Sequence, residues 1–161
     1  MSEKILDPDQ LAAIADSMRA QNRKLVLTNG CFDLLHTGHV RYLQAARALG
    51  DALVVAINGD DSVRALKGEG RPLNTERDRA EVVAALECVD HVVTFPEVRV
   101  TSLLEKVRPA IYVKGGDYTP ATLHPEEGAA LEKIGAEIRI LPFERGYSTS
   151  SLIEKMKKLP A

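Results

Sequence analysis

Tryptophan is absent from the sequence, and aromatic residues of all kinds make up only 4% of it. Long apolar runs are absent too, since none approaches the roughly 20 residues that a transmembrane helix needs. The polar start, Met1 to Asp9, does not resemble a signal peptide. The two cysteines, Cys31 and Cys88, match neither a metal-ligand spacing nor a disulfide framework. We therefore expect a soluble cytoplasmic protein that does not contact a membrane.

The sequence also lacks a marked excess of either charge, with a formal net charge of −2 at pH 7. Binding of a polymeric nucleic acid usually needs a broad basic face, so we do not expect such a partner. A single nucleotide needs only a few local cations and is not excluded. The Gly-x-Gly-x-x-Gly and Walker motifs are missing as well, which disfavours the usual dinucleotide-binding and NTPase functions.

A chain of 161 residues can form one domain with a proper core. We predict a single domain over 1–161, with a leading helix in 1–22 and the core in 24–161. Apolar runs predict five buried strands, at 24–28, 52–57, 89–94, 110–114 and 136–141. Amphipathic patterns predict helices at 8–20, 38–49, 60–66, 100–107, 125–134 and 150–158.

Capping residues mark several helix ends. Gly50 and Gly135 are placed to stop helices. Asp7 is placed to cap the leading helix, and Asp60 or Asp61 to start a later one. Thr75 is expected to cap a further helix whose apolar face is Val82, Val83, Ala85 and Leu86. The segment 67–74 has no core pattern and is expected to be a mobile loop.

Alternating strands and helices indicate an α/β fold, a doubly wound five-stranded parallel sheet with helices on both faces and right-handed crossovers. Ligands of such sheets bind beyond the carboxyl ends of the strands. Four segments that follow strands should therefore share one rim: 28–39, 58–60, 114–117 and the loop before Ser148.

The stretch from Thr28 to His39 has the features that favour phosphate chemistry. His36 and His39 are three residues apart and fall on one face of the first helical turn. That turn offers unpaired N–H groups and the positive end of the helix dipole. Gly38 removes a side chain where a ligand could approach the backbone.

This stretch, with Gly30-Cys31-Phe32-Asp33 before His36-Thr37-Gly38-His39, resembles the signature of the nucleotidyltransferase superfamily that carries His-x-Gly-His. The resemblance covers nearly the whole chain after the first helix. It is strongest to the branch that adenylylates D-glycero-β-D-manno-heptose 1-phosphate, through the segments 66–72, 85–90, 113–118 and 141–150. That branch is often fused behind a sugar kinase. The chain lacks the room for one, so we expect the stand-alone form.

The resemblance implies a Rossmann-like nucleotidyltransferase that joins ATP to the sugar 1-phosphate and releases pyrophosphate, without a covalent enzyme intermediate. Mg²⁺ is expected on the triphosphate, with no ligands from the protein. The product, ADP-heptose, would feed the lipopolysaccharide core or another heptose-containing surface glycan. Family members are often dimers, which leaves a homodimer as an open expectation.

The resemblance also assigns roles to individual residues. Catalytic roles fall to His36, His39 and Lys67, which would neutralise charge on the triphosphate. Nucleotide contacts are implied for both histidines and for Asn29, Gly30, Cys31, Phe32, Arg79, Lys114, Gly116, Asp117, Tyr147, Ser148, Thr149 and Ser150. Contacts with the acceptor are implied for Asp33, Lys67 and Arg71.

These roles have structural alternatives. Lys67 could be a solvated surface lysine, and Arg79 could form a surface salt bridge with Glu76 or Glu81. Asp33 could orient the turn instead of facing the acceptor. The hydroxyls of 148–150 could cap the last helix, alone or in addition to binding phosphate.

Other functions also stay open. One is a cytidylyltransferase acting on glycerol 3-phosphate or a similar small phosphate, although Arg145 stands two positions away from the arginine of the glycerol-phosphate enzymes. Another is a nucleotide-binding regulatory module without turnover. A phosphopantetheine adenylyltransferase would share the fold, but the elements Gly-Gly-Asp-Tyr and Ser-Thr-Ser are not its pattern.

Overall fold

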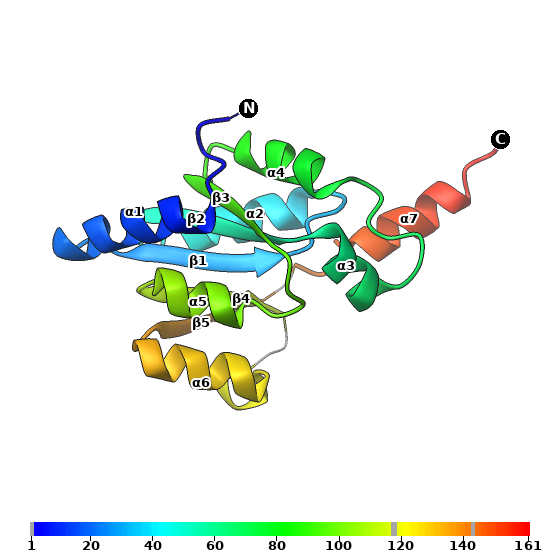
Figure 1. Ribbon diagram of the computed structural model, residues 1–161. Coiled ribbons are helices and arrows are strands. Elements are labelled where there is room, and N and C mark those ends of the chain that lie inside the picture. The colour runs from blue at the N-terminus through cyan, green and yellow to red at the C-terminus, as the bar shows by residue number, and fades with distance from the viewer. Residues whose placement is uncertain (1, 117–118, 143) are drawn as a thin grey trace.

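A parallel sheet forms the centre of the protein (Figure 1). The computed structural model describes residues 2–116, 119–142 and 144–161. Within these ranges five strands pair in the order β3-β2-β1-β4-β5, all of them parallel. The strands are β1 (Leu25–Gly30), β2 (Ala52–Asn58), β3 (His91–Phe95), β4 (Ile111–Gly115) and β5 (Glu137–Leu141). This order confirms the predicted doubly wound α/β fold.

Helices cover both faces of the sheet. They are α1 (Pro8–Ala20), α2 (Thr37–Arg47), α3 (Asp60–Lys67), α4 (Glu76–Ala84), α5 (Thr101–Val107), α6 (Pro125–Ile134) and α7 (Thr149–Lys157), with a 3-10 turn, η1 (Pro120–Thr122). In Figure 1, α1, α5 and α6 lie on one face, α2 and α4 lie on the other, and α7 projects from the body. None of the described helices combines the length and apolar character that crossing a membrane requires.

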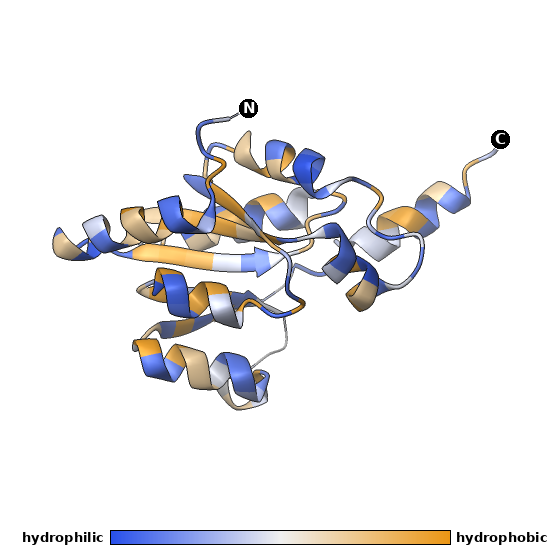
Figure 2. Cartoon of the chain, in the orientation of Figure 1, coloured by the Kyte–Doolittle hydropathy of each residue, from blue (hydrophilic) through white to orange (hydrophobic). Residues whose placement is uncertain are grey.

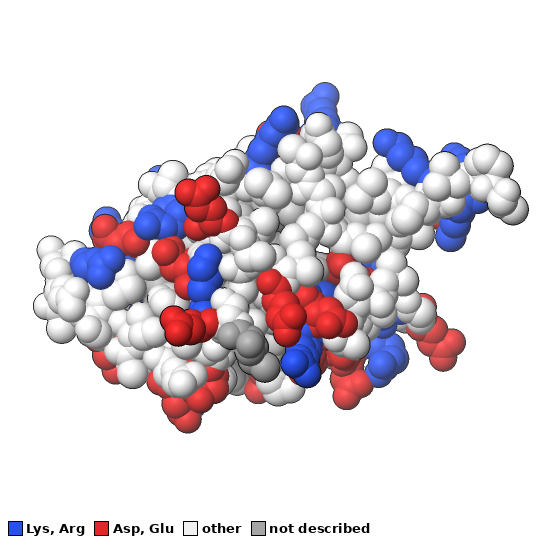
Figure 3. Space-filling view, turned by 90° about the horizontal axis from the view of Figure 1, so that it is seen from above, with Lys and Arg blue, Asp and Glu red and all other residues white. Residues whose placement is uncertain are grey.

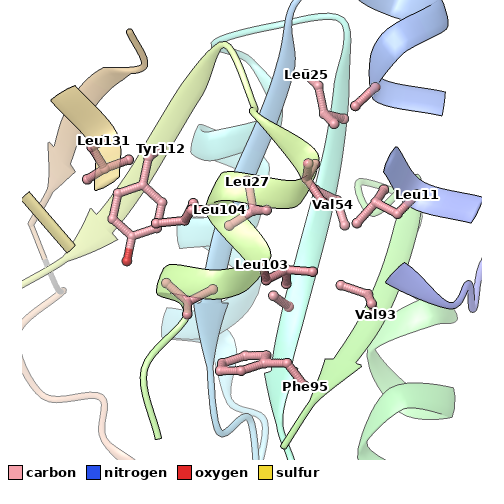
Figure 4. Close-up of a cluster of buried hydrophobic side chains, with 14 of the residues drawn as sticks. Leu11, Leu25, Leu27, Val54, Val93, Phe95, Leu103, Leu104, Tyr112 and Leu131 are labelled. Atoms are coloured by element: carbon pink, nitrogen blue, oxygen red, sulfur yellow. The ribbon is translucent and has the colours of Figure 1, made fainter. Parts of the chain in front are cut away.

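The core consists of two apolar layers, one on each face. Leu27 and Val54 point into the layer beneath α1, α5 and α6 (Figure 4), and Val26 and Val55 into the layer beneath α2 and α4. Every residue of β2 is buried, as expected of a parallel strand covered on both faces. The apolar runs therefore identified the strands because both of their faces are hydrophobic.

The central strands β1, β2 and β4 carry a polar residue at or next to their carboxyl ends: Asn29, Asn58 and Lys114. Figure 2 shows β1 hydrophobic over most of its length and hydrophilic at its tip. The strand order also reverses between β1 and β4, which places the end of β1 at the switch point where such sheets bind ligands. Parallel pairing sets the predicted segments on one rim, except that Asp117 lies outside the described residues.

Two sequence predictions about helix starts are confirmed and one is wrong. Asp7 accepts a hydrogen bond from the amide of Gln10 at 2.8 Å, and Thr75 caps α4. The N-cap of α3 is Gly59, not Asp60 or Asp61, and it makes no side-chain capping bond. The amide of Asp60 instead donates to Glu76 Oε2 at 2.8 Å, so a distant carboxylate does the work of a cap.

The predicted apolar face of α4 is wrong in part: Val83 is buried and Leu86 packs against the core, but the other two members are exposed. Val82 is 53% exposed, and Ala85 is exposed as well. The buried positions are Arg79, Ala80, Val83 and Ala84. Because a charged residue occupies part of the inward face, the hydrophobic pattern alone rotated the predicted face toward the solvent.

This correction predicts opposite effects for two adjacent valines. Val83→Ala should lower the free energy of unfolding by about 2 kcal/mol, because it removes buried methyl groups and leaves a cavity. Val82→Ala should change it by no more than about 0.5 kcal/mol. Urea denaturation of both variants gives the comparison, and equal losses would contradict the orientation of α4.

Candidate functional site

The turn after β1 leads directly into the first turn of α2. Phe32 adopts a left-handed backbone conformation with φ of 50°, and its side chain is buried. Its ring covers Gly30, where a β-carbon would lie 2.9 Å from Phe32 Cε2. The same ring also lies next to His39, with ring centroids 5.6 Å apart. Because Gly30 has no side chain, the ring of Phe32 can pack over it and the turn can fold back on itself.

His36 and His39 form a close pair, with ring centroids 3.9 Å apart. The amide of His36 donates to His39 Nδ1 at 3.3 Å. An accepting Nδ1 places the proton of a neutral His39 on Nε2, which is then a donor for a ligand. Nδ1 of His36 is buried and has no hydrogen-bond partner among the described residues.

Burial keeps both histidines neutral near pH 7. It lowers the pKa of His39 to about 4, with a further contribution from the charge of His36, and it also lowers the pKa of His36. The cationic form expected next to phosphate is therefore not the form of the free protein. A phosphate would have to supply the attraction that raises these pKa values.

Asp33 holds the loop that was expected to be mobile. Its carboxylate accepts hydrogen bonds from the amides of Leu73 and Asn74, at 2.8 and 2.9 Å, and from Arg71 Nε at 2.9 Å. Burial opposes the charged form, but these donors prevail and lower the pKa of Asp33. The mobile-loop prediction is wrong for 71–74, since Asp33 orients that part of the loop.

Arg79 is a buried link between three segments, and not a surface residue. Its Nε donates to the carbonyl of Asn74 at 3.0 Å and its Nη1 to that of Cys31 at 2.6 Å. Its Nη2 pairs with Asp60 at 2.8 Å, and no part of the side chain is exposed. The alternative of a surface salt bridge to Glu76 or Glu81 is therefore wrong. A direct contact between Arg79 and a nucleotide stays a prediction.

Lys67 is the last residue of α3 and is exposed to solvent. The next residue, Gly68, adopts a positive φ of 94°. Its ammonium forms no ion pair with any residue that the structure describes. It is close enough to Cys31 to lower the thiol pKa, although burial has the larger effect and raises that pKa overall. Lys67 is thus a cation near the first turn that is available for a ligand.

The start of α7 lies against the same turn. Ser148 is its N-cap and accepts from the amide of Ser151 at 3.0 Å. Thr149 Oγ1 donates to the carbonyl of Leu34 at 3.0 Å, and Tyr147 stacks on His36. Ser150 is exposed in the first turn of α7. Helix capping is thus established, and phosphate binding by the same residues stays a prediction.

The fourth segment lies at the end of β4. Lys114 Nζ pairs with the buried Glu127 of α6 at 2.9 Å. Gly116 has a φ of 99°, and its amide donates to the carbonyl of Leu141 at 3.0 Å. On β1 beside it, Asn29 Oδ1 accepts from Tyr112 at 2.6 Å. Contacts of these residues with a nucleoside remain predictions.

Sequence reasoning missed several residues that support the site. Arg41 forms an ion pair with Glu144, 103 positions away. The side chain of Asn58 ties the end of β2 to the carbonyls of Glu97 and Val98. The role of Asn58 could have been inferred, because a polar residue at the end of a buried apolar run usually has a hydrogen-bonding task. No local signal exists for a pair so distant in sequence.

A cavity of about 390 Å³ opens at the opposite edge of the sheet, where its lining includes Arg23, Asp51 and His91. Those residues lie at the amino ends of the strands, away from the helix N-termini that face the rim. Figure 3 shows acidic and basic side chains interspersed over one face of the molecule, without a broad area of one sign. In 2–116, 119–142 and 144–161, no three histidine, cysteine or acidic side chains are grouped as metal ligands.

Comparison with known proteins gives one family and a consistent set of relatives. The model of the cytidylyltransferase-like family matches residues 27–155. Proteins named bifunctional protein HldE are 48% identical to this chain in Geobacter metallireducens, over 95% of it, and in Coxiella burnetii, over 97% of it. The chain spans about a third of the length of these relatives, 31% in both cases.

Two solved structures share the fold. A lipopolysaccharide core biosynthesis protein from Thermoplasma volcanium GSS1 is 28% identical, with a TM-score of 0.62 over 78% of this chain and 99% of the other. A pantoate-beta-alanine ligase from Francisella tularensis has a TM-score of 0.59 over 89% of this chain and 68% of the other. Its identity of 17% supports the fold alone.

The contacts of Asp33 predict that it is a main anchor of the loop. Asp33→Asn should lower the free energy of unfolding by about 3 kcal/mol, because it leaves Arg71 partly buried without its counter-ion. The effect should be present above pH 4 and vanish as the pH falls through the lowered pKa of Asp33, where the wild type also loses the charge. Urea denaturation at several pH values measures the stability loss, and the rate of proteolysis measures the anchoring of the loop. Asp61→Asn, which removes an exposed pair with Arg64, should change neither.

The histidine environment predicts an unusual titration. In the free protein, NMR should give a pKa of about 4 for His39 and a value below 6.5 for His36. Since folding lowers these values, stability should decline as the pH falls below about 6.5, and less so in His39→Asn, whose oxygen can replace Nδ1 as acceptor. ATP should raise both pKa values. An ordinary value for His39 in the free protein would contradict the buried geometry.

Proposed function

The chain belongs to the cytidylyltransferase-like family of nucleotidyltransferases, and we propose that it is an adenylyltransferase that joins ATP to D-glycero-β-D-manno-heptose 1-phosphate. The products are ADP-D-glycero-β-D-manno-heptose and pyrophosphate. We place this reaction in the synthesis of precursors for the lipopolysaccharide core or a similar surface glycan.

Three observations support this acceptor and pathway. The segments 66–72, 85–90, 113–118 and 141–150 resemble the heptose branch of the family. The relatives named HldE match 95% or more of the chain. The neighbour at 28% identity is named as a protein of lipopolysaccharide core biosynthesis.

The observation that carries the reaction type is the histidine pair at the start of α2. Its neighbours on the rim are the hydroxyl-rich start of α7, tied to the turn by Thr149, and the ammonium of Lys67. Two helix N-termini and a free cation form a site suited to several phosphates in a row. A binder of one phosphate would not need all of these groups.

In the proposed reaction, a phosphate oxygen of the acceptor attacks the α-phosphorus of ATP in line. The new bond joins that oxygen to the α-phosphorus, and the bond to the β-phosphate oxygen breaks as pyrophosphate leaves. No general base is required, because the attacking phosphate is already ionised. The protein has to position both substrates and to stabilise the charge that develops on phosphate oxygens.

The histidines suit this task as donors. The neutral His39 presents Nε2–H because its Nδ1 accepts the amide of His36. In His36 Nδ1 is buried, which leaves Nε2 as the nitrogen that can meet a ligand. Both rings are partly buried, so a hydrogen bond to phosphate is stronger there than it would be in water.

Lys67 and Arg71 are the cations proposed for the α-phosphate and the acceptor phosphate. Lys67 is a flexible point charge beside a glycine and can follow a phosphate as its charge moves. Arg71 gives only Nε to Asp33, so its two Nη groups remain available among the described residues. Asp33 thus contributes by orienting Arg71. On the basis of the resemblance, Lys114 and Gly116 at the carboxyl end of β4 are proposed to contact the adenosine.

Mg²⁺ is proposed as the companion of ATP, where it would neutralise charge on the triphosphate. The described residues offer no cluster of carboxylates for it. The oxygens of the triphosphate and water suit Mg²⁺, which often keeps several waters.

A panel of two nucleotides and two acceptors tests the proposal. Pyrophosphate release should occur with ATP and the heptose 1-phosphate, and be at least 10-fold slower when CTP or glycerol 3-phosphate is substituted. Activity with CTP and glycerol 3-phosphate alone would favour the cytidylyltransferase. Calorimetric binding of ATP without pyrophosphate release from any acceptor would favour the regulatory module.

His39→Ala tests the role of the pair in the same assay. It should lower kcat by ~10²–10³, the usual effect of removing one donor to the charge of a transition state, while the protein stays folded by circular dichroism. His124→Asn, which preserves the cap of α6, is the matched control and should keep its activity. A folded His39→Ala protein with a near-normal rate would remove the proposed role.

A further inference from the structure

A stack of side chains packs against His36 in addition to His39. The ring of Tyr147 lies nearly parallel to that of His36, at 21° with centroids 6.1 Å apart. The guanidinium of Arg41 lies 5.7 Å from the centre of the Tyr147 ring and forms an ion pair with Glu144. The segment 144–149 therefore crosses the first two turns of α2, and we call it the strap.

Gly38 makes room for this stack. A β-carbon at that position would lie 2.8 Å from Tyr147 Cβ and 2.9 Å from both Cε1 and Nδ1 of His36. Such distances are too short for real contacts, so a side chain there would displace Tyr147 or His36. From its place in the motif, this glycine was expected to leave space for a ligand. In the structure, the space is filled by the protein's own side chains.

His36 depends on this packing for its orientation. The ring of His39 is fixed by a hydrogen bond at Nδ1, whereas Nδ1 of His36 has no partner among the described residues. Rotation of an imidazole without a hydrogen bond is restrained only by the groups that pack against it. For His36 these groups include the ring of His39 and the ring of Tyr147.

We propose that Tyr147 is a positioning residue for His36, which it holds with Nε2 directed to the triphosphate. Arg41 and Glu144 keep Tyr147 in place, and Thr149 fixes the end of the strap to the carbonyl of Leu34. The strap thereby joins the hydroxyls of α7 to the histidine pair as one unit. This role rests on the proposed function, and it differs from a nucleotide contact through the Tyr147 hydroxyl.

Two substitutions of Tyr147 separate these roles. Tyr147→Leu removes the ring and should lower kcat by about 10–100-fold with a smaller change in the KM for ATP, because a misplaced group costs mainly in the transition state. Tyr147→Phe keeps the ring and should restore kcat. A nucleotide contact through the hydroxyl predicts the reverse, with a raised KM in Tyr147→Phe. Met156→Ala, an exposed position further along α7, is the control for general perturbation of this segment.

NMR tests the contact without relying on turnover. The chain has four histidines, so their ring signals can be assigned by substitution. Tyr147→Leu should shift the His36 Cε1–H signal and reduce the rise in its pKa on addition of ATP. Tyr147→Phe and Met156→Ala should leave both readouts as in the wild type.

Arg41→Gln and Glu144→Gln test the support of Tyr147. Each should reproduce part of the Tyr147→Leu effect, and the double variant should lose no more than the worse single variant, since the two residues act as one pair. Unchanged His36 signals in folded Tyr147→Leu would overturn the positioning role, as would shifted signals with unchanged kcat. Failure of the wild type to release pyrophosphate would instead overturn the proposed function.

Discussion

The site depends on the burial of one guanidinium. Arg79 has no exposed side-chain surface, and a buried charge of this kind is tolerated only when its donors are satisfied. Its three nitrogens meet this requirement with the carbonyl of Cys31, the carbonyl of Asn74 and the carboxylate of Asp60. These partners belong to the turn after β1, the loop after α3 and the start of α3. The need to satisfy one charge therefore sets the positions of three segments of the rim.

Asp33 is a second buried charge whose hydrogen bonds fix the position of a neighbouring segment. It is an anion under the loop at 71–74, and two amides and Arg71 satisfy it. Both charged groups lie under the surface on which Lys67 and the histidines are presented. Asp33 and Arg79 use their charges to hold the segments of the rim together. Lys67 has no ion partner among the described residues and is the charge proposed to meet the ligand.

The sequence was sufficient for the fold because the strands are buried on both faces, and apolar runs such as 52–57 report burial directly. Capping residues such as Asp7 and Thr75 were equally readable, because a cap is made within four residues. The inward face of α4 was misjudged because Arg79 occupies it, and hydrophobic patterns do not register a buried charge. The pairs of Arg41 with Glu144 and of Asp33 with Arg71 span 103 and 38 positions. Such pairs depend on the tertiary fold, so no local pattern could reveal them.

The spacing of the histidine motif is then constrained by packing as well as by chemistry. Its first histidine has one buried nitrogen with no hydrogen-bond partner in the part of the chain that the structure describes. Its second histidine is neutral because burial lowers its pKa to about 4. Phosphate stabilises the protonated form of both rings most when their Nε2 atoms already point to the rim. Reorienting a ring would otherwise add to the free-energy cost of protonating it in a partly buried place. The glycine at 38 admits the aromatic ring that restrains His36. Gly38 thus contributes by letting the protein hold in place the imidazole that donates to the ligand.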